Sequence, residues 1–189
     1  MGSSRDRIRF LRDLRSVRRY AEALVPAEVV ADLLEVARWT GSSANRQPWE
    51  LVVVRDPATR RALAEAGATP GHVPLADAPL VIAVVLDSPS SAFDGGRLCE
   101  RLLLAASAHG LGASLVGFKA EAESKAKAVL GVPPDRALPR VVVAGYPAAP
   151  TARLVSAERS ADPRLPLNRL PLGRKPTAEL VHEERYTSR

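Results

Sequence analysis

The sequence lacks several features that would assign it to particular classes of protein. A single cysteine, Cys99, rules out an intrachain disulfide and is interpreted as a thiol buried in the core. No apolar run approaches the length of a membrane span, and the charged residues 1–15 lack the apolar segment of a signal peptide. We therefore expect a cytoplasmic protein with no membrane partner.

Sequence motifs for nucleotides, metals and hydrolysis are also missing. Gly110 and Gly112 lack the third glycine of a dinucleotide fingerprint, and they precede a predicted strand instead of following one. No phosphate-binding P-loop occurs, and the three histidines share no metal-ligand spacing. Ser42 and Ser43 are not flanked by the glycines of a nucleophile elbow, which argues against a serine hydrolase.

Positive charge exceeds negative charge, but in a pattern that does not indicate nucleic acid. The chain has 27 lysines and arginines against 21 acidic residues, with a net charge of +6 and an isoelectric point near 10.1. Few of the cations are lysines, and the arginines are scattered along the chain, often beside acids. Because no nucleic-acid motif accompanies them, we interpret them as a solvated surface and expect no nucleic-acid partner.

The hydrophobic pattern predicts helices packed on a sheet. Hydrophobic residues make up 46% of the 189 residues and aromatic residues only 4%, so small aliphatic side chains must fill the core. Periodicity predicts helices at 5–14, 27–39, 56–66, 93–109 and 121–130, and strands at 51–54, 80–86, 113–118 and 140–144. Loops are expected at 67–78 and 88–91. Core packing is expected for Trp49, Phe93 and Phe118, with the lining of a flavin pocket as the alternative for the two phenylalanines.

The composition changes after Pro147. Prolines recur at positions 150, 163, 166, 171 and 176, and few residues are periodic, so a separate domain is not expected. The segment is either disordered or an extended arm that lies on another surface. A short helix is expected after Thr177.

Two polar segments contain candidate binding residues. Residues 14–20 (LRSVRRY) place three arginines and a serine after the first predicted helix, and such groups bind phosphate bidentately. In an extended segment, Ser16 and Arg18 would point to one side. Residues 41–49 (GSSANRQPW) offer small hydroxyls and an amide that suit a polar heterocycle. The alternatives are a solvated basic turn for the first segment and ordinary turn residues for the second.

These segments and several later ones occur in an order that resembles the nitroreductase family of FMN enzymes. The basic segment precedes a Val-Pro helix start, a long helix and the Ser-Ser-x-Asn-x-Gln-Pro-Trp loop. Asp94-Gly95 begins a helix that ends His-Gly-Leu-Gly, and the later pieces are LVGF at 115–118, LPRVVVAGYP at 138–147 and LGRKP at 172–176. The resemblance covers about residues 8–182 and depends on the joint pattern.

The resemblance implies a fold and an assembly. It implies an α+β protein, a nitroreductase-like three-layer α/β/α sandwich with a mixed, mainly antiparallel central sheet. Residues 1–149 would form the FMN-binding core. Residues 150–189 would form a C-terminal arm of the same domain that wraps the partner subunit of an intertwined homodimer.

The resemblance also implies a set of cofactor-binding residues. The first segment would bind the phosphate and the pyrimidine side of FMN, through Arg15, Ser16 and Arg18, and Arg18 would be the cation near flavin N1 and O2. The loop residues Ser42, Ser43 and Asn45 would reach the FMN bound mainly by the other subunit. Leu115, Val116 and Gly117 would pass beside the isoalloxazine, where a backbone N–H bonds flavin N5. Arg174 would clamp the phosphate, with Lys175 as its neighbour.

The implied activity is hydride transfer from NAD(P)H through FMN to a nitroaromatic or quinone-like small-molecule acceptor, with ping-pong kinetics and no catalytic side chain. Three departures from the family pattern leave alternatives open. Leu14 stands where an arginine is usual, Gly41 where a proline is usual, and no helical excursion follows the strand that ends at Leu86. A flavin-binding or ligand-binding relative without turnover, or a specialised enzyme such as a biosynthetic dehydrogenase or a reductive dehalogenase, fits the same pattern.

Overall fold

The computed structural model describes residues 3–67, 74–149 and 177–186 of the chain. The chain divides into two compact units, Met1–Pro150 and Thr151–Arg189, which are described separately. In the second unit the structure describes one helix, α7 (Thr177–Leu180), at the place where the sequence predicted it. Arg174 and Lys175, the late basic residues that the resemblance implied, lie outside the described residues.

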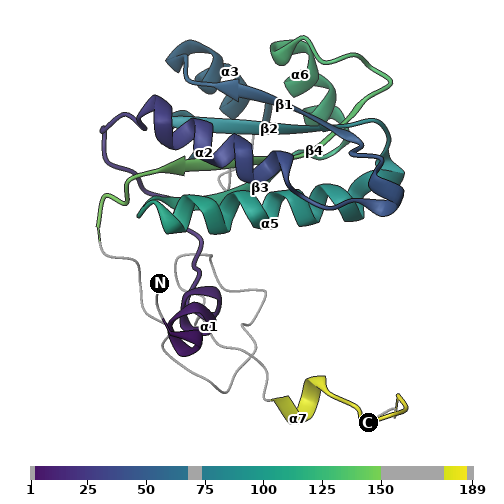
Figure 1. The fold of residues 1–189 in the computed structure, drawn as a ribbon. Helices are drawn as coiled ribbons and strands as arrows, with labels where there is room; N and C mark the ends of the chain where they lie inside the picture. The colour runs from purple at the N-terminus through teal and green to yellow at the C-terminus, as the bar shows by residue number, and fades with distance from the viewer. Residues whose placement is uncertain (1–2, 68–73, 150–176, 187–189) are drawn as a thin grey trace. The chain divides into compact units, whose positions relative to one another are not determined.

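The first unit is built on a four-stranded sheet (Figure 1). Its strands are β1 (Trp49–Val54), β2 (Leu80–Leu86), β3 (Gly112–Gly117) and β4 (Ala137–Gly145), in the order β1-β2-β4-β3. All three neighbouring pairs are antiparallel, and one parallel bridge joins Ser16 to Ala113. The expected antiparallel character of the sheet is therefore confirmed, whereas the described strands include no parallel pair and the parallel component is limited to the Ser16–Ala113 bridge.

Helices cover both faces of this sheet, so the unit has three layers (Figure 1). The core on one face includes residues of α2 (Ala27–Arg38) and α5 (Ala92–Ala108), and the core on the other includes residues of α3 (Pro57–Gly67), α4 (Pro74–Asp77) and α6 (Ala120–Leu130). A further helix, α1 (Ser4–Arg12), has no buried residue. The α/β/α sandwich implied by the resemblance is confirmed.

Strand β2 explains why one segment of the sequence is apolar throughout. Successive side chains of a strand point to opposite faces. Leu80, Ile82, Val84 and Leu86 belong to the core with α2 and α5, and Val81, Ala83 and Val85 belong to the other core. Because both faces are covered, every residue of β2 is buried.

Short local signals set several helix ends as the sequence predicted. The backbone N–H of Thr59 donates to Asp56 Oδ2 at 2.8 Å, which caps the start of α3. Helix α5 ends before His109 and Gly110, and α6 ends at Gly131; both glycines have positive φ, 72° and 67°. Glycine adopts this conformation without the penalty that a Cβ imposes.

Some elements differ from the predictions. The expected loop at 67–78 contains the helical turn α4, because Leu75 is fully buried and the Arg60 guanidinium donates to the carbonyl of Ala76 at 3.1 Å. The segment 88–91 contains a 3₁₀ turn, η3 (Pro89–Ser91). Phe93 is not a core residue, since 79% of it is exposed, whereas Phe118 is buried. Within the described part of the chain, no helix combines the length and the apolarity needed to span a membrane.

Candidate functional site

The basic segment lies beside the first residues of β3. The backbone N–H of Val17 donates to the carbonyl of Ala113 at 2.9 Å, next to the bridge between Ser16 and Ala113. Val17 is buried, while its neighbours Ser16 and Arg18 are exposed. The bridge favours the extended form over the solvated turn that the sequence left open, and in that form Ser16 and Arg18 point to the same side.

Gly112 allows this close approach. A Cβ on Gly112 would lie 2.5 Å from the Cβ of Val17, well inside the distance of a normal contact. Any side chain at this position must displace the segment that carries Arg15, Ser16 and Arg18. The glycine is thus required by packing against Val17.

Tyr20 fastens the other end of the basic segment. Its hydroxyl donates to the carbonyl of Val17 at 2.5 Å and lies 3.5 Å from Ser114 Oγ. Burial raises the pKa of Tyr20 to about 12, and the bond to Ser114 and the charge of Arg18 oppose this rise. Tyr20 consequently stays neutral at physiological pH and acts as an anchor, not as an acid.

The backbone of β3 alternates in direction. The carbonyl of Ala113 accepts a hydrogen bond from the backbone N–H of Val17, so the backbone groups of Ala113 face away from β4. In an antiparallel pair, residues that face the neighbouring strand alternate with residues that face away. Leu115 therefore directs its N–H away from β4, whereas Val116 directs its N–H toward β4. By the same alternation Gly117 also faces away from β4, so among the three predicted residues it is Val116 whose backbone N–H is turned toward β4 and away from a ligand.

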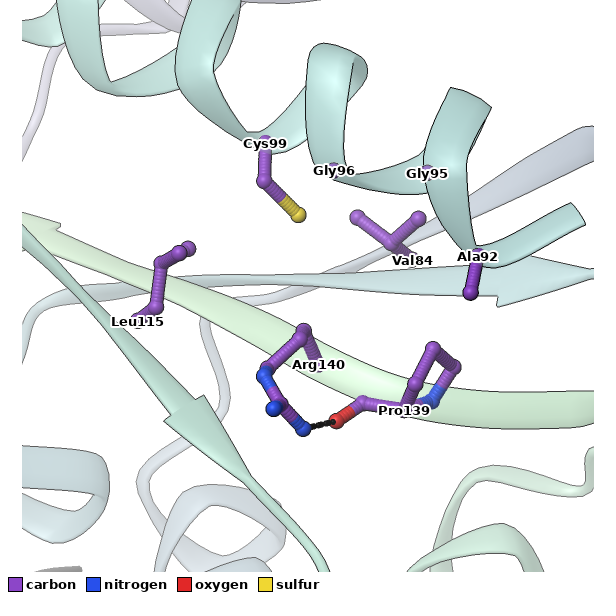
Figure 2. Close-up of a pocket in the computed structure, with 8 residues that line it drawn as sticks. All are labelled: Val84, Ala92, Gly95, Gly96, Cys99, Leu115, Pro139 and Arg140. Atoms are coloured by element: carbon purple, nitrogen blue, oxygen red, sulfur yellow. Dashed lines mark hydrogen bonds between the residues drawn. The ribbon is translucent and has the colours of Figure 1, made fainter. Parts of the chain in front are cut away.

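A cavity of about 270 Å³ lies between α5 and the sheet, beside Leu115 (Figure 2). Figure 2 shows α5 residues on one side of the cavity and strand residues on the other. The residues that line it are Val84, Ala92, Gly95, Gly96, Cys99, Leu115, Pro139 and Arg140. Seven of the eight are apolar or small, so the lining suits a flat, largely apolar group.

Arg140 supplies the charge of this cavity. It lies on β4, opposite Gly117 of β3 and Val84 of β2. Its Nη1 donates to the carbonyl of Pro139 at 2.6 Å, and a Cβ on Gly117 would lie 2.6 Å from the same nitrogen. The guanidinium is therefore held against Gly117. Arg140 was not among the residues predicted from the sequence, although a charged residue within an apolar strand is a signal that could have indicated it.

Cys99 faces the cavity from α5 and is almost fully buried. Burial raises the pKa of its thiol to about 11, and the charge of Arg140 opposes this rise. At neutral pH the group is a thiol and a poor nucleophile. The predicted buried core thiol is confirmed.

The loop with Ser42, Ser43 and Asn45 has an unusual backbone. Ala44, Asn45 and Gln47 have positive φ values of 48°, 54° and 49°. Asparagine tolerates this conformation, but alanine and glutamine rarely adopt it, so the loop is held in a strained form. Ser42 Oγ contributes to holding it by accepting the backbone N–H of Gln47 at 2.8 Å.

Asp94 also holds the loop from the first turn of α5. Its buried carboxylate accepts the backbone N–H of Ser43 at 3.2 Å through Oδ2, and Arg97 Nη1 lies 3.5 Å from Oδ1. A Cβ on Gly41 would lie 3.0 Å from Arg97 Nη2. Glycine at position 41 thus leaves room for the Arg97 guanidinium beside the loop.

The structure brings most of the sequence-predicted residues to two places. The first place is β3: the segment with Arg15, Ser16 and Arg18 lies beside its start, and the strand itself contains Leu115, Val116 and Gly117. The second place is the start of α5, where Asp94 binds the loop that contains Ser42, Ser43 and Asn45. Ala92 and Gly95 of the cavity belong to that same part of α5. In the described ranges, no cluster of three or more histidine, cysteine or acidic side chains is arranged to hold a metal ion.

The fold and the site define a class of protein: a three-layer α+β unit whose edge strand carries a basic segment at its start and borders an apolar cavity further along. Comparison with known proteins identifies the family to which this class of protein corresponds. The nitroreductase family matches residues 11–146, and the chain belongs to this family of oxidoreductases.

Individual relatives agree with the family match. The chain is 34% identical to an NADH dehydrogenase of Thermus thermophilus, over 85% of this chain and 92% of the relative. A nitroreductase of Desulfovibrio desulfuricans solved in complex with FMN is 27% identical, with a TM-score of 0.74 over 99% of this chain and 100% of that chain. An FMN-dependent nitroreductase of Clostridium difficile is 25% identical, with a TM-score of 0.74 over 77% of this chain and 90% of that chain.

Proposed function

We propose that the protein binds FMN and transfers electrons from NAD(P)H to nitroaromatic or quinone-like acceptors. One observation carries the proposal: β3 joins a basic segment at Ala113 to an apolar cavity at Leu115. FMN has the matching division, with an anionic phosphate at one end and a flat ring system at the other. The FMN-bound relative from Desulfovibrio desulfuricans supports the choice of cofactor.

The basic segment is assigned to the phosphate and the pyrimidine side of the ring. Arg15 and Ser16 would donate hydrogen bonds to phosphate oxygens, because a guanidinium fork and a hydroxyl match that group. Arg18 would place a positive charge near N1 and O2 of the flavin. Arg174 is proposed as a further phosphate ligand, with Lys175 as its neighbour.

The cavity is assigned to the isoalloxazine. Bound FMN would supply two-electron chemistry, taking a hydride equivalent from NAD(P)H and passing it to the acceptor. The chain itself would orient the ring, between α5 and the segment of Leu115, Val116 and Gly117. The outward N–H of Leu115 is the proposed donor to flavin N5. No side chain is assigned as a catalytic acid or base, since solvent can deliver protons.

A homodimer is part of this proposal. Helix α1 has no buried residue, and its Ile8 and Leu11 are 64% and 52% exposed. Trp39 and Phe93 are 67% and 79% exposed. Covering large apolar side chains such as these by a partner subunit would be favourable. A second copy would cover them, place Ser42, Ser43 and Asn45 against the partner's FMN, and provide the surface for an arm formed by residues 150–189.

The second candidate function is flavin binding without turnover of a generic acceptor. The specific observation in its favour is the connection between β2 and α5, where η3 (Pro89–Ser91) is the helical element present. The resemblance to the family implies that larger members carry a helical excursion here, which would roof the substrate. A protein without this roof would bind FMN and yet fail to oxidise NAD(P)H with a nitroaromatic acceptor.

The first experiment is the visible absorption spectrum of the purified protein with added FMN, followed by anaerobic addition of NAD(P)H. We expect about one flavin per subunit, and we expect its absorption band to bleach with the reductant. Bleaching followed by reoxidation with a nitroaromatic or a quinone supports the enzyme. Binding without bleaching favours the second candidate, and failure to bind FMN contradicts both.

A further inference from the structure

Arg140 occupies a position that the proposed phosphate site does not explain. It lines the cavity between α5 and β3, and it is the one charged residue among the eight that do so. Among the described residues it has one hydrogen bond, to the carbonyl of Pro139, and no ion pair. A guanidinium carries five N–H donors, so most of its donor capacity is available to a ligand.

The strand register separates Arg140 from the basic segment. Arg140 pairs with Gly117 at the end of β3, whereas Ser16 pairs with Ala113 near its start. Four residues of strand span about 13 Å. A ligand that lies along β3 would therefore meet Arg15 and Ser16 with one end and Arg140 with the other.

We infer that Arg140 is a further cation of the cofactor site, beside the proposed Arg15, Arg18 and Arg174, which contacts the isoalloxazine in the cavity and favours the negative charge that the ring acquires on reduction. This inference rests on the proposed function and adds a residue to it. In FMN the phosphate and the ring are far enough apart for Arg15 and Arg140 to recognise different parts of one molecule.

Two physical features make the guanidinium effective there. Arg140 itself is exposed, but the other seven residues that line the cavity are apolar or small, so no acidic side chain of the lining competes with a ligand for its positive charge. Its position is also fixed in advance, by the bond to Pro139 and by the close packing against Gly117. A donor that is already in place does not have to reorganise when the ring is reduced.

A purely structural role for Arg140 is the alternative, in which it only fills the space beside Gly117. The two roles differ in what they do to the flavin. A structural role affects folding and leaves a bound flavin's affinity for electrons unchanged. A cofactor contact alters that affinity even where the fold and its stability are retained.

The test compares riboflavin with FMN and then measures sulfite binding to the flavin-loaded protein. Riboflavin lacks the phosphate, so it reports on the ring site alone. Sulfite adds to flavin N5 and leaves negative charge on the ring, so its dissociation constant reports on nearby cations. The variants are R140Q, R140K, R15Q and, as the matched control, R136Q, which alters an arginine outside the cavity that lies 3.4 Å from Glu50.

We expect R140Q to weaken riboflavin and FMN by a similar factor and to raise the sulfite dissociation constant about tenfold, the size of one charge-assisted hydrogen bond. R140K, which keeps the charge and loses the fork, should fall between wild type and R140Q. R15Q should weaken FMN and leave riboflavin unchanged. R136Q should match wild type in every measurement.

Several outcomes would overturn the inference. Wild-type sulfite and riboflavin affinities in R140Q, with a loss of FMN in R15Q, would reject it while the proposed function stands. If R140Q does not fold, the sulfite dissociation constant of R140K is the test instead. A wild-type value in R140K rejects the inference. If wild-type protein binds neither riboflavin nor FMN, the proposed function fails and the inference fails with it.

Discussion

The backbone N–H of Ser43 donates a hydrogen bond of 3.2 Å to the carboxylate of Asp94, a residue 51 positions away in the sequence. Asp94 is only 5% exposed, and its second oxygen lies 3.5 Å from Arg97. This contact joins the first turn of α5 to a loop in which Ala44, Asn45 and Gln47 have positive φ. The buried carboxylate of Asp94 thus holds the strained loop, and the next residue, Gly95, lines the cavity.

We predict that D94A lowers the free energy of unfolding by about 2–3 kcal/mol, because a buried hydrogen bond to a charged group is lost and Arg97 loses its ion-pair partner. D94N keeps the shape and one acceptor oxygen, so it should cost less. Denaturant unfolding measures both. If the proposed cofactor role of the loop is right, FMN affinity falls in the same order, and equal FMN affinity in all three proteins would contradict it.

A second prediction uses two glycines at the start of β3. G112A should weaken FMN binding at least tenfold, because its Cβ would lie 2.5 Å from Val17 and push the basic segment outward. G110A is the control. Nothing lies within 4 Å of a Cβ at Gly110, so this variant meets only the penalty of positive φ, about 1 kcal/mol. Both variants should lose stability, and only G112A should lose FMN; a similar loss of FMN in G110A would contradict the assignment.

The sequence could predict the layers and the basic segment because each depends on nearby residues. The apolar run at Leu80–Leu86 indicates a strand covered on both faces, and β2 is such a strand. The serine and arginines at 15–18 indicate a basic polar segment, while its extended form depends on the bridge between Ser16 and Ala113 and was not predicted. The strand order β1-β2-β4-β3 is set by packing between distant segments, which no local pattern records.

Arg140 shows why part of the site could not be predicted. Its neighbours in sequence are the apolar residues of a buried strand, and by alternation it shares a face with Val142 and Ala144. That much was available from the sequence. What was not available is that α5 docks so that a cavity remains beside this point of β4, with open space at Gly96. A cavity between two elements depends on their docking, so its charged residue emerges only from the structure.

A third prediction separates the two glycines of α5. G96A should be tolerated or stabilising by about 0.5–1 kcal/mol, because nothing lies within 4 Å of its Cβ and alanine favours a helix. G95A should destabilise by about 1–3 kcal/mol, because its Cβ would lie 2.9 Å from Leu86 Cδ1 in the core. Thermal unfolding of the two variants tests this order.

A larger side chain at Gly96 tests the cavity itself. G96L should fold, since its Cβ meets open space, but its side chain would occupy the volume that the proposed ring needs. We expect G96L to lose riboflavin binding at least tenfold while G96A retains most of it. Full riboflavin affinity in a folded G96L would show that the ring binds elsewhere.

The last prediction concerns Cys99, whose pKa burial raises to about 11 from a value of 9.0 for an ordinary thiol. At pH 8 the fraction of thiolate should therefore be about a hundredfold lower than for a free cysteine, and iodoacetamide should react correspondingly slowly with the flavin-free protein. Stability has a matching dependence. The thiol contribution is fully present below pH 9 and is lost as pH rises toward 11, because the unfolded chain releases the proton first.

Arg140 opposes this rise, so the thiol also reports on the cavity's charge without any cofactor. R140Q should raise the pKa of Cys99 further and slow alkylation at every pH below it, with the midpoint of the rate–pH curve displaced upward. R136Q should leave the curve unchanged. If R140Q instead speeds alkylation by the same factor at all pH values, the variant has opened the cavity to the reagent, and the close electrostatic relation between Arg140 and Cys99 is contradicted.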